Sequence, residues 1–317
     1  MLKFLARRIA AAAFLIAVAA TIVFFSIHLL PGDPVLILLG EQGAANAEVV
    51  ARIRGQLNLD APLYRQYIDW VSAVAVGDFG NSLQSGVPVA EELARRIPRS
   101  LELIAAGLAI ATLFGLPLGI IAARRRNAPS GLAASAIAVL GFSSPVFVTG
   151  ILLVLLFSLW LRVLPSSGYV AFAEDPVAHL SYALLPALTI GINFMGVVTR
   201  MTRASLADVL RRDFVRAARA RGLSQAQAVY RHALPNALIP VVAILGVRAG
   251  NLLGGTVIIE ALFDWPGISS LLVSACFARD YPMIQGSLVA IFAMFALISF
   301  AVDVLQGTID PRVRAQQ

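Results

Sequence analysis

Six apolar stretches, each of about 20 residues or more, constrain the fold of this chain more than any other feature. About 20 consecutive apolar residues is the length that a helix needs to cross a bilayer. Only 14% of the residues are charged, whereas soluble domains have about 25%. These features exclude a disordered chain, a coiled coil and a purely soluble enzyme. They predict an all-α polytopic membrane protein with six transmembrane helices, at residues 9–30, 101–123, 132–161, 180–198, 237–262 and 283–305.

The basic residues predict how the chain is oriented. Arginine and lysine concentrate before the first stretch, after the second, between the fourth and fifth, and after the sixth. The two short loops on the other side contain only Arg162 and Arg279. Under the positive-inside rule, both termini and the 200–235 loop therefore face the cytoplasm. Three arginines before the second stretch lie on the outer side, but in a loop of about 70 residues, and long loops translocate largely regardless of charge.

This orientation divides the chain into three parts: 1–30, the N-terminus and first helix; 31–100, an extracytoplasmic loop; and 101–317, a five-helix core. The first part is similar to a signal peptide, but its apolar run is too long and no cleavage site follows, so we expect a retained helix. The outer loop is either a lid of amphipathic helices on the membrane surface or a docking surface for an extracytoplasmic partner. A short helix is expected within it at residues 89–97.

Several kinds of chemistry are excluded by residue types that the chain lacks. Lys3 is the only lysine, and a P-loop needs a lysine inside a glycine-rich loop. Cys276 is the only cysteine, and the three histidines are far apart in sequence, so no disulfide or cysteine metal site is expected. We expect no bound metal or cofactor and no catalytic site in this chain.

Local signals in the 200–235 loop predict two short helices. The Ala/Arg-rich run 211–221 favours a helix, and Gly222 follows it where a left-handed C-terminal cap would end that helix. Ser224 and Gln227 have the spacing of a capping box, which starts a second helix at about 223–233, before Pro235. We expect a short helix held between two turns at the cytoplasmic face, either coupling to a soluble partner or contacting lipid headgroups as an ordinary basic loop.

The spacing in this loop resembles the EAA loop of binding-protein-dependent ABC importer permeases. That pattern is E-A-A, three residues, G, nine residues, I, one residue, L-P. Here Arg216 replaces the glutamate and His232 the isoleucine, and both departures resemble the dipeptide/oligopeptide/nickel branch. Other segments resemble the same branch in the same order: 31–34 (PGDP), 77–82, 254–260, 263–267 (FDWPG) and 279–282 (RDYP).

The resemblance implies the first of two permease subunits of an ATP-driven importer in the bacterial cytoplasmic membrane. Its implied partners are a second homologous permease, one or two ATP-binding subunits that hold ATP and Mg, an extracytoplasmic substrate-binding protein and membrane lipid, but no nucleic acid. The implied solutes are di- or oligopeptides, a nickel chelate or glutathione. The residues implied to couple to the ATPase are Arg216, Ala217, Ala218, Arg219, Gly222, Ser224, Gln227, Leu234 and Pro235.

Residues in and near the spans supply further candidates. Gly246, Gly250 and Gly254 have the spacing that lets one helix approach another closely, either within this chain or against the second permease. Arg248 lies near mid-membrane, where charge is costly; it either binds an anionic group in the pathway or pairs with a carboxylate such as Asp303. Weaker pathway candidates are Asn193, Met195 and Asn251. Candidates for docking the binding protein are Asp78, Phe79, Asp264, Trp265, Arg279 and Asp280. The charged residues at 260, 264, 279 and 280 have a second interpretation, in which they hold the outer loop.

Two other functions compete with the importer. A gradient-driven secondary transporter would show deep charges and broken helices near the midplane, and Arg248 is the only clear deep charge in the sequence. An intramembrane enzyme would need a nucleophile and base or a metal set, and no such cluster is evident.

Overall fold

The computed structural model describes residues 2–28, 51, 54–55 and 60–309, and within that part the chain forms helices and no strands. In order the elements are α1 (Leu2–His28), α4 (Leu63–Ala75), α5 (Val89–Arg124), α6 (Pro129–Ser143), α7 (Val146–Leu153), η1 (Val154–Trp160), α8 (Pro176–Val209), α9 (Asp213–Ala220), α10 (Gln225–Gln227), η2 (Ala228–Ala233), α11 (Leu234–Gly255), α12 (Val257–Leu262), α13 (Ile268–Ala278) and α14 (Tyr281–Ile309). The all-α prediction is confirmed.

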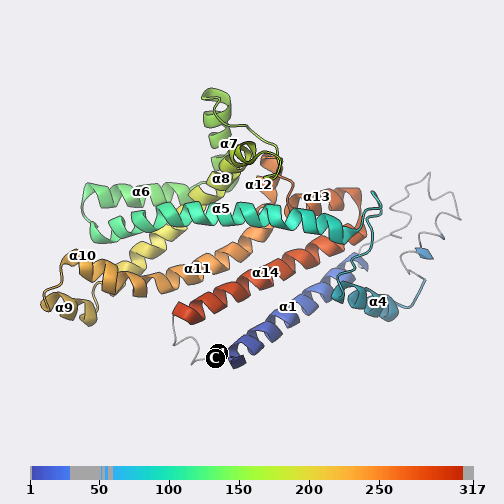
Figure 1. Ribbon diagram of the computed structural model, residues 1–317, viewed down its shortest axis with the longest axis horizontal. Coiled ribbons are helices and arrows are strands. Elements are labelled where there is room, and N and C mark those ends of the chain that lie inside the picture. Colours follow the sequence, from blue (N-terminus) through green and yellow to red (C-terminus); the bar gives the residue numbers. More distant parts are fainter. Residues whose placement is uncertain (1, 29–50, 52–53, 56–59, 310–317) are drawn as a thin grey trace.

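The predicted spans appear as five helices long and apolar enough to cross a membrane, together with one broken pair. The five are Ala6–Ser26, Val89–Arg124, Pro176–Val209, Gln225–Val247 and Tyr281–Val304, counted within the described residues. Most of them run along the long axis of the molecule (Figure 1). The end that carries α9 and α10 lies opposite the end that carries α4.

The third predicted span is not one straight helix. α6 ends at Ser143, and α7 with η1 continues at an angle of 104°, so this segment projects from the rest of the bundle (Figure 1). The break falls at Ser144 and Pro145, because proline lacks a backbone N–H and disfavours helix at the preceding residue. Asn193 of α8 donates its side-chain amide to the carbonyl of Ser144 at 3.0 Å, which satisfies part of the exposed helix end.

The centre of the bundle is the contact between α5 and α8. Small residues on α5 let the two backbones approach: a methyl group added at Gly115 would lie 2.8 Å from Cβ of Val198, and one at Gly119 would lie 2.5 Å from Cβ of Thr202. Such close packing of small residues is how helices associate within membranes. It holds α8 rigidly against α5 along most of its length.

α11 packs on α14 through Gly246 and Gly250. A methyl group at Gly250 would lie 2.7 Å from the Phe295 ring, and one at Gly246 would overlap Val302. These two glycines therefore face a helix of the same chain, which agrees with the first of the two alternatives and not with packing between two permeases. The surroundings of Gly254 lie outside the described part of the structure.

α1 also lies beside α14, and an ion pair joins them. Arg8 and Asp303 approach within 2.7 Å, with side chains 30% and 23% exposed. Asp303 is the partner that the sequence suggests for Arg248, whereas the structure pairs Asp303 with Arg8. The side chain of Arg248 lies outside the described part.

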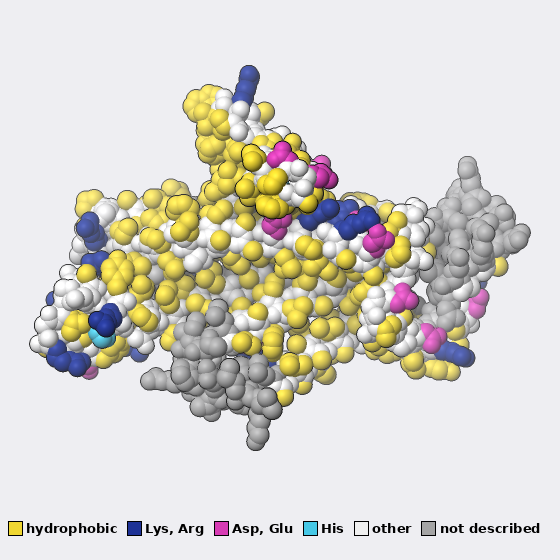
Figure 2. All heavy atoms as spheres, in the orientation of Figure 1, with side chains coloured by type: hydrophobic (Ala, Val, Ile, Leu, Met, Phe, Trp, Pro, Cys, Tyr) yellow, Lys and Arg dark blue, Asp and Glu magenta, His cyan; other side chains and the backbone are white. Residues whose placement is uncertain are grey.

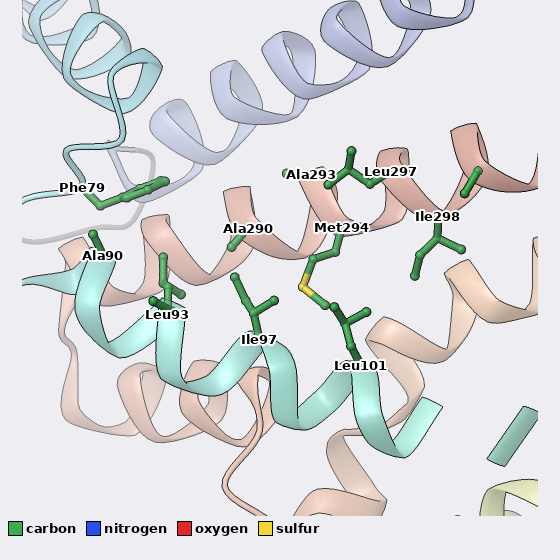
Figure 3. A pocket seen from close by; sticks show the side chains of 12 residues that line it. Phe79, Ala90, Leu93, Ile97, Leu101, Ala290, Ala293, Met294, Leu297 and Ile298 are labelled. Carbon is green, nitrogen blue, oxygen red and sulfur yellow. The ribbon is translucent and has the colours of Figure 1, made fainter. Parts of the chain in front are cut away.

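An apolar groove of about 530 Å³ runs between α5 and α14. Figure 3 shows side chains from both helices, among them Leu93, Ile97, Met294 and Ile298, pointing into it. Its lining is almost wholly hydrocarbon, as expected for a surface inside a bilayer.

At the end of the molecule that carries α4, the expected short helix at 89–97 is the first part of α5, which continues without interruption to Arg124. Pro98 does not break the helix. α4 packs on the outer end of α1, where the Phe24 ring lies 5.6 Å from that of Trp70 and 5.4 Å from that of Tyr67. The predicted 31–34 motif lies outside the described residues.

Candidate functional site

The candidate site is the basic hairpin, defined here as residues 213–233, which contains α9, the turn at Gly222, α10 and η2. α9 begins at Asp213, whose negative charge suits a helix N-terminus, and its run of alanine and arginine favours helix. Val215 and Ala218 are buried, whereas the residues between them are exposed. One face of α9 is therefore fixed to the protein, and the other is free for a partner.

The buried face belongs to a small apolar core. Val215 clusters with Leu206 and Val209 from the end of α8, with Val229 and Ala233 from η2, and with Ala237 from α11. Ile120 and Ala123 of α5 pack against the same cluster. A force applied to α9 therefore acts through this core on three membrane helices.

Gly222 makes the turn that reverses the chain. Its φ is +93°, a left-handed conformation that side-chain-bearing residues rarely adopt, and its N–H bonds the Arg219 carbonyl at 2.9 Å. A methyl group added there would meet nothing within 4 Å. The glycine is therefore required by backbone conformation rather than by space.

The capping box predicted from the spacing is present. Gln227 donates its backbone N–H to the Ser224 hydroxyl oxygen at 3.2 Å, and Ser224 donates its N–H to the Gln227 side-chain oxygen at 3.0 Å. These two bonds satisfy donors that a helix start leaves unpaired.

The helix that the capping box starts does not end before Pro235, which corrects the prediction of a helix held between two turns. α10 passes through η2 into α11, and residues 225–247 form one continuous span. Pro235 lies in the first turn of α11, where proline is tolerated. It follows directly on the π-helical segment η2, and Ala233 and Leu234 before it keep helical backbone. The Asn236 side-chain amide bonds the His232 carbonyl at 2.9 Å. The separate short helix of this loop is α9.

The free surface of the hairpin is basic and partly aromatic. Figure 2 shows Lys and Arg side chains gathered at the end of the molecule that carries α9 and α10, while hydrophobic side chains cover its middle. Arg216 and Arg219 are exposed, with Phe214 and Tyr230 43% and 52% exposed. A hollow of about 140 Å³ lies between Arg216, Arg219, Arg124 and Gln225. Such a surface suits a partner that offers carboxylates and an apolar side chain.

The pathway candidates on α8 have ordinary packing roles in the structure. The Asn193 amide bonds the end of α6, as described, and Met195 packs half-buried beside Ala111 and Val198. The side chains of Arg248 and Asn251 lie outside the described part. Among the described residues, no group of three or more His, Cys, Asp or Glu could hold a metal ion.

Two of the outer docking candidates are buried, which corrects their assignment. Trp265 is 1% exposed and donates its indole N–H to the Arg99 carbonyl at 3.1 Å. Asp280 is 3% exposed, and its carboxylate accepts bonds from the Ser82 hydroxyl and the Leu83 N–H, which ties the outer loop to α14. Both hold the outer face together instead of facing a partner. Exposed candidates remain at Asp78, Asp264 and Arg279, with Phe79 half-buried.

Sequence reasoning missed a buried polar network at this outer face. Glu260 is fully buried, and its carboxylate accepts bonds from the Ser100 hydroxyl at 2.7 Å and the Ser270 N–H at 2.8 Å. His179 is buried as well, between the Val170 carbonyl and the Glu102 carboxylate. The position of Glu260 at the edge of a long apolar stretch was the one signal in the sequence for a buried carboxylate. The sequence gives no signal for the contact between His179 and Glu102, because the two segments share no motif.

The comparisons with known proteins agree with this geometry. Residues 115–315 match the family described as binding-protein-dependent transport system inner membrane component, and residues 1–104 match the N-terminal family of the same membrane components. Over 314 residues the chain is 40% identical to the glutathione transport system permease protein GsiC of Escherichia coli K12, covering 99% of each chain. The GsiC of Salmonella typhi gives the same identity and coverage.

Solved structures show the same fold. An inward-facing conformation of the MetNI methionine ABC transporter superposes with a TM-score of 0.58 at 19% identity, covering 69% of this chain and 96% of that chain. A second crystal form of it gives a TM-score of 0.55 at 20% identity, with the same coverage.

Proposed function

The chain belongs to the family of binding-protein-dependent transport system inner membrane components, and on that premise we propose that it imports glutathione or a similar small peptide. It is a permease subunit of an ABC importer, and ATP hydrolysis is the work of a separate subunit. The observation that carries the proposed substrate is the 40% identity to a glutathione permease over nearly the whole of both chains.

We also propose that the hairpin is where the ATPase subunit docks. Its exposed arginines and aromatic rings offer charge-assisted hydrogen bonds and apolar contacts to a partner. Its buried face shares one core with α5, α8 and α11. When ATP binding moves the ATPase, the hairpin would carry that displacement to these helices and switch the pathway between inward-open and outward-open.

The proposed assembly contains a second homologous permease, one or two kinds of ATPase subunit holding ATP and Mg, and an extracytoplasmic substrate-binding protein. The basic hairpin supports a cytoplasmic location for both chain termini, because positive charge concentrates on that side. Asp78, Asp264 and Arg279 are the exposed residues proposed to meet the binding protein. A gradient-driven transporter is not favoured, because the relatives are components of binding-protein-dependent systems.

Co-purification tests the docking. The tagged chain is expressed with its neighbouring subunits, extracted in mild detergent and compared with Gly222→Asp. The substitution adds a negative charge and strains the left-handed turn, so we expect the ATPase to be lost while the permease stays folded.

Gly77→Asp is the matched control. Gly77 also has a positive φ, +86°, with nothing within 4 Å of an added methyl group, but it lies in the outer loop. It should retain the ATPase. Recovery of the ATPase with Gly222→Asp, or a wild-type chain that never retains one, would contradict the proposal.

A further inference from the structure

Arg200 lies within the membrane-spanning length of α8, although the sequence placed it in the cytoplasmic loop. α8 is continuous to Val209 and packs on α5, where Thr202 meets Gly119. Arg200 is two residues further from the cytoplasm than Thr202. Its Cα is therefore about 10 Å from the level of Arg124, the last residue of α5, at about 1.5 Å of rise per residue.

The side chain of Arg200 extends still deeper. Its guanidinium carbon lies 4.6 Å from the centre of the Phe142 ring, and Phe142 is level with Gly196, since a methyl group there would lie 2.9 Å from Cβ of Phe142. The guanidinium is therefore about 16 Å from the level of Arg124, near the middle of a hydrocarbon core about 30 Å thick. An arginine facing lipid would extend toward the headgroups instead.

Arg200 is exposed at this depth. Among the residues that the structure describes, no carboxylate lies within ion-pair distance of it, and its interaction is with the face of the Phe142 ring. An exposed arginine at the centre of a bilayer is costly unless it faces water or an anion. The surface of α8 that carries Arg200 therefore faces a polar space and not lipid.

The break between α6 and α7 points to the same surface. Phe142 is the penultimate residue of α6, and the non-helical backbone at Ser144 follows directly. Ser143 and Pro145 on either side of it are exposed. Irregular backbone at membrane depth occurs only where protein buries it or where it lines a water-filled cavity. An exposed break beside an exposed arginine indicates the water-filled cavity.

We propose that Arg200 lines the translocation pathway and binds the C-terminal carboxylate of the peptide in transit. The Phe142 ring holds the guanidinium through a cation–π contact, which leaves its N–H donors free for a bidentate bond to a carboxylate. The inference rests on the proposed function, because it assigns a binding group to the path of an imported peptide.

ATP-dependent uptake into proteoliposomes that contain the complete transporter and its binding protein tests the proposal. The probes are glutathione and glutathione carrying an amide at its glycine carboxylate. In Arg200→Gln we expect the ratio of acid to amide uptake to fall about tenfold, because a charge-assisted bond is lost; Arg200→Lys should restore most of it. The binding protein's own preference between the two probes affects wild type and variant equally, so it cancels when their acid-to-amide ratios are compared. Arg212→Gln, on the cytoplasmic surface, should leave the ratio unchanged.

The outcomes separate the two proposals. A wild-type complex without ATP-dependent glutathione uptake contradicts the proposed function. A wild-type complex that imports glutathione, with an unchanged acid-to-amide ratio in Arg200→Gln, overturns only the role of Arg200. An equal loss of both probes also overturns it, since that result indicates a structural contact or a carboxylate of the partner permease.

Cysteine labelling tests the polar space independently of uptake. Cys276 is the only cysteine, so Arg200→Cys in a Cys276→Ser background gives a single thiol. We expect a charged methanethiosulfonate reagent to modify it in the assembled transporter. Leu113→Cys is the matched control, since Leu113 is 67% exposed on α5 at similar depth but on an apolar surface; it should react at least about tenfold more slowly. Equal reaction rates would contradict the proposal.

Discussion

Glu260 shows how a single buried carboxylate organises the outer face. Its two oxygens accept bonds from Ser100 on α5 and Ser270 on α13, while Glu260 itself belongs to α12. The Ser100 hydroxyl oxygen in turn accepts the N–H of Ile268 at 2.8 Å. Three helices thus share one network, and leaving any of its polar atoms unpaired would be costly because the site excludes water.

Gly267 is the residue on which this network depends for space. A methyl group added there would overlap the Glu260 carboxylate and the Ser100 hydroxyl, so Gly267→Ala must displace one of them. We expect it to lower stability by about 1–3 kcal/mol, the usual range for overpacking, measured as thermal unfolding in detergent. Gly255→Ala is the control, because nothing lies within 4 Å of the added methyl group. Equal melting temperatures for the two variants would mean that the network has room to adjust.

The capping box at Ser224 and Gln227 fixes the start of α10, the second half of the hairpin. Ser224→Ala removes the hydroxyl that accepts the Gln227 N–H, and loss of such a cap costs about 1 kcal/mol. We expect faster hydrogen exchange in residues 225–233, while exchange in α9 changes little. Ser224→Asp, which keeps an accepting oxygen, should restore protection. Unchanged exchange in Ser224→Ala would show that tertiary packing alone holds this start.

The sequence predicts the features that depend on interactions between residues close together in the chain. The capping box and the turn at Gly222 depend on residues a few positions apart, and both were predicted from spacing. The apolar stretches depend on length and composition, and they predicted the spans. The continuity of α10 with α11 depends on the backbone of Ala233 and Leu234 staying helical before Pro235, and no pattern in the sequence specifies that.

Contacts between distant segments explain the remaining differences. Asp280 carries a charged side chain typical of an exposed site, and Trp265 an amphipathic ring typical of interfaces, but Arg99 and Ser82, far away in the sequence, supply their partners. Gly246 has the spacing for helix packing, and only the position of α14 shows that the partner is internal. Arg200 was assigned to a loop because the apolar stretch ends before it, whereas tertiary packing extends α8 to Val209.

The whole molecule is polarised along its long axis, with the basic hairpin at one end and α4 with α13 toward the other (Figure 1, Figure 2). Positive charge at one end of a bundle of apolar helices orients it in a membrane, because basic segments stay on the cytoplasmic side. The network around Glu260 and the contacts of Asp280 then belong to the outer end. This orientation is a proposal that a single thiol at each end can test.

Cys276 supplies that thiol at the outer end, since it lies exposed on α13. We expect a membrane-impermeant thiol reagent to label it in intact spheroplasts, whereas Phe214→Cys in a Cys276→Ser background, on α9, should react only after the membrane is opened. Although the side chain is exposed, partial desolvation raises the pKa of the Cys276 thiol above its ordinary value. Because the thiolate is the reacting form, the protonated fraction is larger than for a free thiol at pH 8, and labelling should speed up as pH rises toward that pKa. Labelling of Phe214→Cys in sealed spheroplasts, together with no labelling of Cys276 in the wild-type chain, would reverse the orientation and place the hairpin outside, where no ATPase could reach it.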